Sequence, residues 1–175
     1  EELDIPVMHD DQHGTAIISG AALLNGLEIV GKDIGSVNVV VSGAGASAIS
    51  CAKHYVKLGV SKDKIILIDS NGILTKKRME KGELNRYKEE FARDIPDGDL
   101  AKAMIGADVF LGLSKGGLVS KKMVSTMAKN PLIFALANPD PEILPTEISK
   151  VRDDAIIATG RSDFPNQINN VLGFP

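Results

Sequence analysis

Residues 36–48 of the chain read Ser36-Val37-Asn38-Val39-Val40-Val41-Ser42-Gly43-Ala44-Gly45-Ala46-Ser47-Ala48. The first half of this stretch is short and β-branched and runs into serine and glycine, which is typical of a buried strand. The second half fits the pattern Gly-x-Gly-x-x-(Gly or Ala) and leads into a helix predicted over residues 46–58. A strand that passes through a glycine turn into a helix indicates the first unit of a doubly wound α/β sheet.

Similar apolar runs predict four further strands, over residues 64–68, 108–112, 132–136 and 155–158. These runs are continuous rather than alternating, which indicates strands covered on both faces in a parallel sheet. Helices are predicted over residues 15–29 and 46–58, with Cys51 on the packed side, and from an N-cap at Ser120 through Ala128. The charged segment 76–93 is predicted to include an exposed helix or loop. We therefore expect one Rossmann-like domain over residues 1–175, with a doubly wound, mostly parallel sheet and helices on both faces.

The composition excludes several classes of protein. Hydrophobic residues make up 43% of the chain and charged residues 25%, which is the balance of a soluble globular protein. The longest uninterrupted apolar run, residues 132–137, is too short to cross a membrane. A net charge of −3 gives no electrostatic reason to expect a nucleic-acid partner. The acidic start at residues 1–4 is unlike a secretory signal, and a single cysteine suits the reducing cytoplasm, where we expect the protein.

The glycine turn predicts a dinucleotide site. Gly43 would allow the tight turn, Gly45 would let the backbone approach a pyrophosphate, and Ala48 is small enough for close packing between helix and strand. Asp69 ends the next strand, 21 residues beyond Ala48, and its carboxylate could accept hydrogen bonds from the adenosine ribose. The predicted cofactor site comprises Gly43, Ala44, Gly45, Ala46, Ser47, Ala48 and Asp69.

Other interpretations of these residues stay open. The turn could simply make a corner between strand and helix, and Asp69 could be a turn former before Asn71-Gly72. As a cofactor residue, Asp69 favours NAD over NADP because a carboxylate repels a 2′-phosphate. A basic cluster after this strand could reverse that preference, or could be a solvated surface; it comprises Lys76, Lys77, Arg78, Lys81, Arg86 and Lys88. The choice between NAD and NADP therefore stays open.

A second candidate site lies before the first predicted helix, where Asp10 and Asp11 stand between His9 and His13. The partial positive charge of a helix N-terminus could keep both aspartates ionised. Mg²⁺ and Mn²⁺ take such oxygen ligands, although adjacent carboxylates cannot easily face one ion, so one would ligate and the other would hold a cation of the protein. Ordinary helix capping explains the same residues equally well.

A third cluster consists of side-chain amides near the predicted strand ends: Asn138, Gln167, Asn169 and Asn170. Uncharged amides that reach carboxylate oxygens could orient a small acid. Each of them could also serve in a turn, because Asn-Pro and Pro-Asn are turn dipeptides. Together with a nucleotide-binding edge, they favour a small polar substrate.

Segments 5–16, 43–48, 134–139 and 158–171 together resemble the NAD(P)-binding domain of malic enzymes, and the His-Asp-Asp-Gln-His-Gly-Thr form of residues 9–15 resembles the bacterial-type branch. The resemblance implies oxidative decarboxylation of L-malate to pyruvate and CO₂, with NAD or NADP and a divalent metal, Mg²⁺ or Mn²⁺. It also implies a homo-oligomer.

The resemblance assigns a role to each candidate residue. Asp11 would be a metal ligand and Asp10 would contact the catalytic lysine. Thr15 and the Gly43 turn would serve the cofactor, while Asn138 and Asn170 would bind malate or lie beside the nicotinamide.

The family's Glu-Asp pair, lysine base and tyrosine acid precede the acidic segment and do not occur in this chain, so we expect the 175 residues alone to be inactive. The ending at residues 173–175 likewise looks cut short by comparison with the family. A non-catalytic NAD(P)-binding module and another two-domain amino-acid or hydroxy-acid dehydrogenase are the alternative functions.

Overall fold

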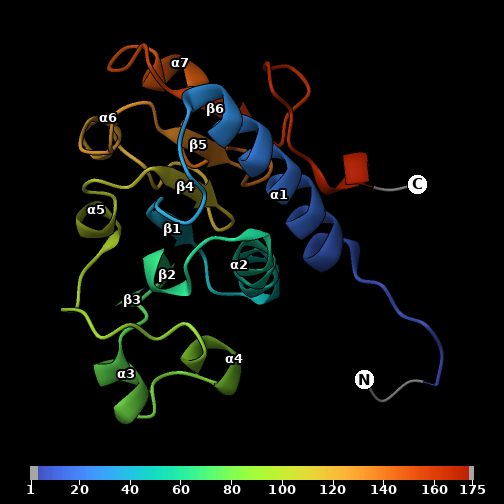
Figure 1. The fold of residues 1–175 in the computed structure, drawn as a ribbon, viewed down its shortest axis with the longest axis vertical. Helices are drawn as coiled ribbons and strands as arrows, with labels where there is room; N and C mark the ends of the chain where they lie inside the picture. Colours follow the sequence, from blue (N-terminus) through green and yellow to red (C-terminus); the bar gives the residue numbers. More distant parts are fainter. Residues whose placement is uncertain (1–3, 174–175) are drawn as a thin grey trace.

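The computed structural model describes residues 4–173 and contains a six-stranded sheet in the order β3-β2-β1-β4-β5-β6 (Figure 1). The five predicted strands are present as β1 (Val39–Ser42), β2 (Ile65–Asp69), β4 (Val109–Gly112), β5 (Leu132–Ala135) and β6 (Ile156–Thr159). All five pair in parallel, and Val39 lies opposite both Ile65 and Val109. A sixth strand, β3 (Gly72–Ile73), was not predicted; it folds back antiparallel onto β2. The predicted doubly wound, mostly parallel sheet is confirmed.

The helices agree with the prediction in part. They are α1 (Asp10–Val30), α2 (Ala46–Leu58), α3 (Lys76–Glu80), α4 (Arg86–Glu89), α5 (Leu100–Ala103), α6 (Lys121–Ser125) and α7 (Pro145–Ile148), with 3₁₀ turns η1 (Lys62–Lys64) and η2 (Asn170–Gly173). Helix α2 has the predicted bounds, whereas α1 begins at Asp10 rather than at residue 15.

The Ser120 hydroxyl caps α6 as predicted, but the helix ends at Ser125 because the Ala128 amide turns away to donate to the Ala107 carbonyl, 2.9 Å away. Helices α5 and α7, of four residues each, are too short for a periodic pattern to reveal them.

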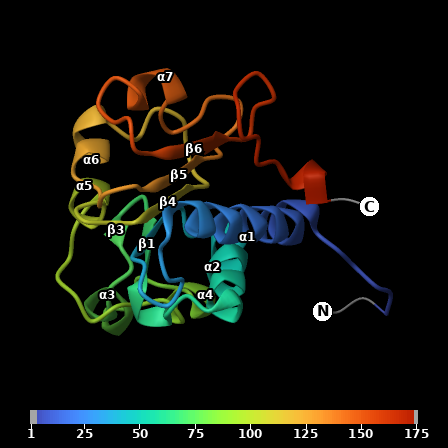
Figure 2. The same ribbon diagram turned by 45° about the horizontal axis from the view of Figure 1, so that its top comes forward.

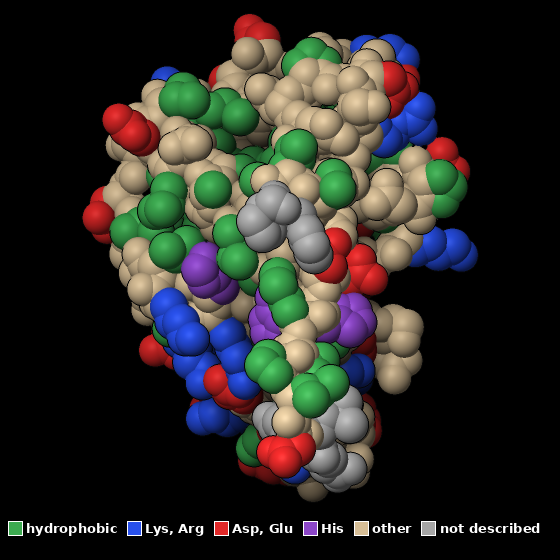
Figure 3. Space-filling model, turned by 90° about the vertical axis from the view of Figure 1, so that its right-hand side faces the viewer, with side chains coloured by type: hydrophobic (Ala, Val, Ile, Leu, Met, Phe, Trp, Pro, Cys, Tyr) green, Lys and Arg blue, Asp and Glu red, His purple; other side chains and the backbone are tan. Residues whose placement is uncertain are grey.

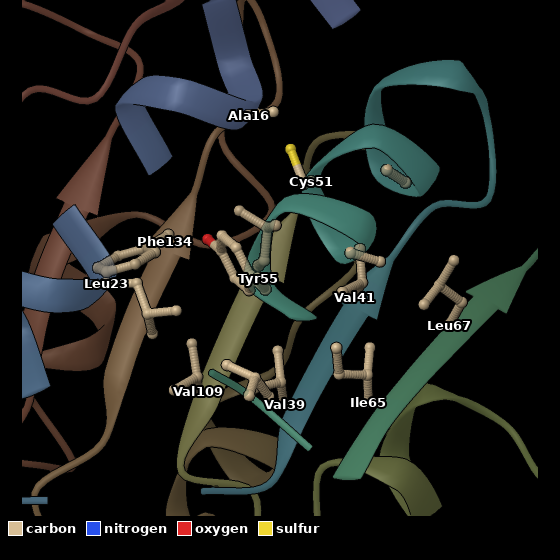
Figure 4. Close-up of a cluster of buried hydrophobic side chains, with 14 of the residues drawn as sticks. Ala16, Leu23, Val39, Val41, Cys51, Tyr55, Ile65, Leu67, Val109 and Phe134 are labelled. Carbon is tan, nitrogen blue, oxygen red and sulfur yellow. The ribbon is translucent and has the colours of Figure 1, made fainter. Parts of the chain in front are cut away.

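Two apolar layers cover the sheet. Helices α1 and α2 lie on one face and α5, α6 and α7 on the other (Figures 1 and 2). Strand side chains alternate between the layers, so Val39 and Val41 face α1 and α2 while Val40 faces the opposite helices. Figure 4 shows the first layer, in which the Cys51 sulfur points toward Ala16 of α1. Ser19 of α1 bonds the Cys51 sulfur through its hydroxyl, at 3.7 Å, and accepts from the Tyr55 hydroxyl through its carbonyl, at 3.3 Å. Cys51 is therefore packed as predicted, and burial raises the pKa of its thiol to about 11.

Helix α1 corrects one expectation. Within residues 4–173 it is the one helix whose length of 21 residues and apolar composition would suffice to cross a membrane. The expectation that no segment could do so is therefore wrong on those two criteria. Leu23 and Leu27 of this helix are buried against the sheet layer, and a core helix of that kind passes the same test.

The direction of the strands positions the candidate site. Because the strands are parallel, their carboxyl ends share one edge of the sheet, and both α1 and α2 begin beside that edge (Figure 2). Strand β1 lies between β2 and β4, so the later strands are added first on one side of β1 and then on the other. Ligands of doubly wound sheets bind beside this topological switch point. Figure 3 shows the side on which α1 begins, where histidine and acidic side chains gather.

Candidate functional site

The glycine turn after β1 has the geometry that the sequence predicts. Gly43 has a φ of 126°, and a Cβ there would lie 2.9 Å from the Leu113 carbonyl oxygen, so both the backbone and the space require glycine. Gly45 differs, because a Cβ there would meet no atom within 4 Å. Ala48 is buried and packs behind the turn. Helix α2 thus begins without a side-chain cap, and the open space at Gly45 leaves room for an anion beside its first turn.

The acidic segment forms the first turn of α1 rather than the approach to it, which corrects the predicted helix boundary. The side-chain amide of Asn170 donates to one carboxylate oxygen of Asp10 and, at 3.4 Å, to one of Asp11. The other oxygen of Asp10, Oδ1, is buried and has no hydrogen-bond partner within residues 4–173. A Cβ on Gly14 would lie 2.2 Å from this oxygen, so glycine keeps the space for the carboxylate.

The nucleotide turn and the acidic turn touch each other. The hydroxyl of Ser47, in the first turn of α2, donates to the backbone carbonyl of Asp11. A cavity of about 200 Å³ opens at this contact. Its polar lining consists of Asp11, Thr15, Ser47, Ser114, Asn138, Asn169 and Asn170, and its apolar lining of Ile18, Leu113, Leu136, Ala137 and Ile168. Residues from all three predicted clusters therefore meet at one cavity.

The residues present fit one side of a metal site. Asp11 brings a carboxylate to the cavity, and the unpartnered oxygen of Asp10 lies in the same helical turn, where a cation would satisfy it. Within residues 4–173 no group of three histidine, cysteine, aspartate or glutamate side chains is arranged to hold a metal. A divalent ion bound at Asp11 would need further oxygen ligands, from water, substrate or other protein groups.

The structure gives Asp69 charge partners that bear on the choice of dinucleotide. Its carboxylate accepts two hydrogen bonds from Arg78, at 3.0 and 3.1 Å, one from Lys88 at 2.9 Å and one from the Asn71 amide at 2.9 Å. Burial alone would raise the pKa of Asp69, but the bonds from Arg78, Lys88 and Asn71 outweigh it and lower this pKa to about 2. Two cations thus neutralise the charge that would repel a 2′-phosphate, and this removes the argument for NAD.

The amide cluster divides into two groups. Asn138, Asn169 and Asn170 line the cavity. Gln167 instead donates to the Gly160 carbonyl at 3.3 Å, and it therefore serves the turn after β6. Asn169 also donates to this carbonyl, at 3.2 Å.

Sequence reasoning missed two kinds of residue here. The apolar lining, such as Ile18 and Leu113, carries no chemical signal, because core side chains look the same in a sequence. The buried Glu142 also escaped notice; its carboxylate accepts bonds from the Ser114 and Ala137 amides, both at 3.1 Å, next to the cavity. A glutamate between Pro141 and Ile143 in a turn gives no sign that it points inward.

Comparisons with known proteins agree with this geometry. Residues 12–175 match the family model described as malic enzyme, NAD binding domain. The chain is 53% identical over 173 residues to a probable NADP-dependent malic enzyme of Rickettsia prowazekii. This alignment covers 99% of the chain and 22% of that protein. It is 50% identical over 175 residues to the NAD-dependent malic enzyme of Rhizobium meliloti, covering all of this chain and 22% of that protein.

A solved structure of Entamoeba histolytica malic enzyme superimposes with a TM-score of 0.92 at 42% identity, covering all of this chain and 37% of that one. The chain thus spans about a fifth of the length of these two relatives and over a third of the solved chain. Because the family model matches nearly the whole chain, the chain belongs to the malic enzyme family, as its NAD-binding domain.

Proposed function

We propose that this chain is the dinucleotide-binding part of an enzyme that converts L-malate to pyruvate and CO₂ with NAD or NADP and Mg²⁺ or Mn²⁺. The observation that supports the proposal is the cavity at which the glycine turn, Asp11 and the amides of Asn138 and Asn170 meet. Oxidation of a hydroxy acid needs the dinucleotide and the substrate in contact, and metal-assisted decarboxylation needs a cation beside the substrate. One small cavity would supply that proximity.

The residues of the chain would divide the work. The amides at the start of α2 and the open space at Gly45 would hold the pyrophosphate, while Asn138 and Asn170 would orient the carboxylates of malate. Asp11 would hold the divalent cation, and Asp10 would hold a cationic side chain of the protein through its unpartnered oxygen. When bound, the dinucleotide accepts a hydride from the substrate, and the divalent cation withdraws electron density from the oxygen atoms of the substrate.

Either dinucleotide fits this site. An adenosine ribose could still bind beside Asp69 and Lys88. Arg78 and Lys88 neutralise the Asp69 carboxylate, so its charge would not exclude a 2′-phosphate. Relatives named NADP-dependent and NAD-dependent are similarly close to this chain, which supports leaving both open. We further propose that the protein is a cytoplasmic homo-oligomer, which rests on the family and on the single buried cysteine.

The test is malate-dependent reduction of NAD⁺ or NADP⁺ by the full-length protein, followed by the absorbance of the reduced nicotinamide over a range of Mn²⁺ concentrations. Asp11→Asn should raise the Mn²⁺ concentration for half-maximal rate about tenfold or more, because it removes a charged ligand. Asp33→Asn, an exposed aspartate beyond the other end of α1, is the matched control and should change nothing. Dinucleotide binding without malate oxidation would instead favour the non-catalytic module.

A further inference from the structure

Glu142 lies fully buried behind the cavity, in the turn that follows β5. One of its carboxylate oxygens accepts the Ser114 amide hydrogen and the other accepts the Ala137 amide hydrogen, each at 3.1 Å. Within residues 4–173 no ion pair includes Glu142, so backbone amides are its hydrogen-bond partners. Each oxygen therefore holds a different loop.

Gly112 makes room for this carboxylate. A Cβ on Gly112 would lie 2.2 Å from the carboxyl carbon of Glu142 and within 2.5 Å of both its oxygens. The backbone of Gly112 is ordinary strand at the end of β4 and does not itself require glycine. The missing side chain at Gly112 is thus explained by the carboxylate of Glu142 and not by a turn.

The two loops that Glu142 joins are walls of the cavity. Leu113 and Ser114 follow β4 and line one side, whereas Leu136, Ala137 and Asn138 follow β5 and line the other. Backbone bonds from Gly117 to Pro141, at 3.1 Å, and from Val119 to Glu142, at 3.0 Å, tie the outer parts of these loops together. Near the cavity, the carboxylate of Glu142 bridges the two loops.

This arrangement costs free energy, because burial disfavours a charged carboxylate. Burial raises the pKa of Glu142, and the two amide bonds oppose that rise. The ionised form accepts from both amides through two equivalent oxygens. A glutamine in the same place would turn its NH₂ group, a donor, toward one of the two N–H groups.

The sheet order tells which part of a dinucleotide lies between these walls. The glycine turn after β1 would hold the pyrophosphate, and Asp69 at the end of β2 marks the adenosine side. Because β2 and β4 flank β1 on opposite sides, the nicotinamide half must extend over the ends of β4 and β5. Those are the two strands whose following loops Glu142 joins.

We propose that Glu142 is a positioning residue for the nicotinamide half of the dinucleotide, acting through the amides of Ser114 and Ala137. The proposal rests on the proposed function. Glu142 does not line the cavity; it bonds the two loops that do, between which the nicotinamide and its ribose would lie. The adenosine half lies on the other side of β1 and does not depend on it.

Glu142→Gln in the full-length protein tests the proposal, with calorimetric titrations of NAD⁺, NADP⁺ and ADP-ribose, which lacks the nicotinamide. We expect the Kd of the preferred dinucleotide to rise about fivefold or more, and that of ADP-ribose to stay within about twofold. Asp108→Asn is the matched control. This carboxylate accepts from the Asn38 amide at 2.9 Å and from Lys32 at 2.7 Å, just before the amino end of β4, so its loss should leave both affinities unchanged.

Equal weakening of the dinucleotide and ADP-ribose, or no weakening of either, would overturn the positioning role while the proposed function stood. A wild-type protein that binds neither dinucleotide would overturn the proposed function and this inference with it. If the variant does not fold, amide hydrogen exchange of the wild type decides. Exchange at Ser114 and Ala137 should slow on addition of the dinucleotide but not of ADP-ribose, and an equal response to both would refute the proposal.

Discussion

At the scale of single residues, the two glycines of the nucleotide turn are present for different reasons. Gly43 has a left-handed backbone and no room for a side chain, so the fold needs it. Gly45 has a φ of −84° and open space where its Cβ would be, so the folded chain by itself does not require glycine at this position. What remains to explain Gly45 is a ligand that comes close to the backbone.

Gly45→Ala should therefore separate binding from stability. We expect the free energy of unfolding to change by less than about 1 kcal/mol, and the Kd for the dinucleotide to rise about tenfold or more as the methyl group meets the pyrophosphate. Gly43→Ala should instead cost about 1–3 kcal/mol of stability, because alanine is strained at this φ and meets the Leu113 carbonyl. Urea denaturation and calorimetric titration measure the two effects; unchanged affinity in Gly45→Ala would contradict the assignment of the turn.

The charge cluster at Asp69 makes stability depend on pH. The pKa of Asp69 is lowered from 3.8 to about 2 in the folded protein. A lowered pKa stabilises the fold above the unfolded value and loses that contribution as the pH falls through the folded value. The window is therefore from about pH 4 down to about pH 2.

We expect Asp69→Asn to lower the free energy of unfolding at pH 7 by about 1–3 kcal/mol, because Arg78 loses a buried partner. The difference from wild type should shrink as the pH falls toward 2, which urea denaturation at several pH values would measure. Asp63→Asn, at an exposed position before β2, provides the control. A difference that stays constant with pH would show that the Asp69 ion pairs do not carry this dependence.

At the scale of elements, α1 links the core to the site. Its first turn carries Asp10 and Asp11 beside the cavity, and its middle packs against α2 and β5. Close approach depends on small residues: a Cβ on Gly26 would lie 2.8 Å from Leu132 of β5. The helix ends at Val30 and is capped by Gly31, whose left-handed backbone allows its amide and the next one to bond carbonyls of the last turn. The position of the acidic turn is thus set by packing along the whole helix.

Adjacent leucines in α1 offer a matched pair for this packing. Leu23 is 0% exposed and Leu24 is 44% exposed. Leu23→Ala should lower the free energy of unfolding by about 2–5 kcal/mol, since it leaves a cavity between helix and sheet. Leu24→Ala should change it by no more than about 0.5 kcal/mol. Chemical denaturation of both variants is the measurement, and equal losses would contradict the described orientation of α1.

At the scale of the whole molecule, the site depends on contacts between distant parts of the chain. Asn170, close to the end of the chain, bonds Asp10 and Asp11 near its beginning. Ser47 of α2 bonds the Asp11 carbonyl. The dinucleotide turn and the carboxylate proposed to bind the metal therefore belong to one connected structure, and a change in one should be felt by the other.

Ser47→Ala should raise the Mn²⁺ concentration for half-maximal activity of the full-length protein about threefold to tenfold, although Ser47 is not a proposed metal ligand. The reason is that Asp11 loses a bond that fixes its backbone. Ser149→Ala is the control, because that hydroxyl also donates to a backbone carbonyl, of Pro145 at 3.0 Å, but lies far along the chain in the α7 region. An unaltered Mn²⁺ requirement in Ser47→Ala would show that the two turns act independently.

The sequence predicted the sheet and the glycine turn because these depend on local patterns. Val39, Val40 and Val41 form a buried strand by their apolar character, and Gly43 marks the turn by its backbone freedom. Strand β3 and the short helices α5 and α7 escaped, because two to four residues carry too little periodicity.

The charge partners of Asp69 were not predicted, because Arg78 and Lys88 lie nine and nineteen residues along the chain. The sequence left open whether these side chains reverse the cofactor preference or form a solvated surface, and no spacing rule shows that they turn toward Asp69. The same limit hid Glu142, whose partners lie in two separate loops.

The sequence by itself therefore determined the doubly wound sheet, the position of the nucleotide turn and the family, since each is encoded in continuous runs of residues. Only the tertiary structure decided that Ser47 meets Asp11, that Asp69 is neutralised and that Glu142 joins two walls of the cavity. The physical reason is that charge pairing and burial depend on which side chains approach in space, whereas strand and turn formation depend chiefly on neighbours along the chain.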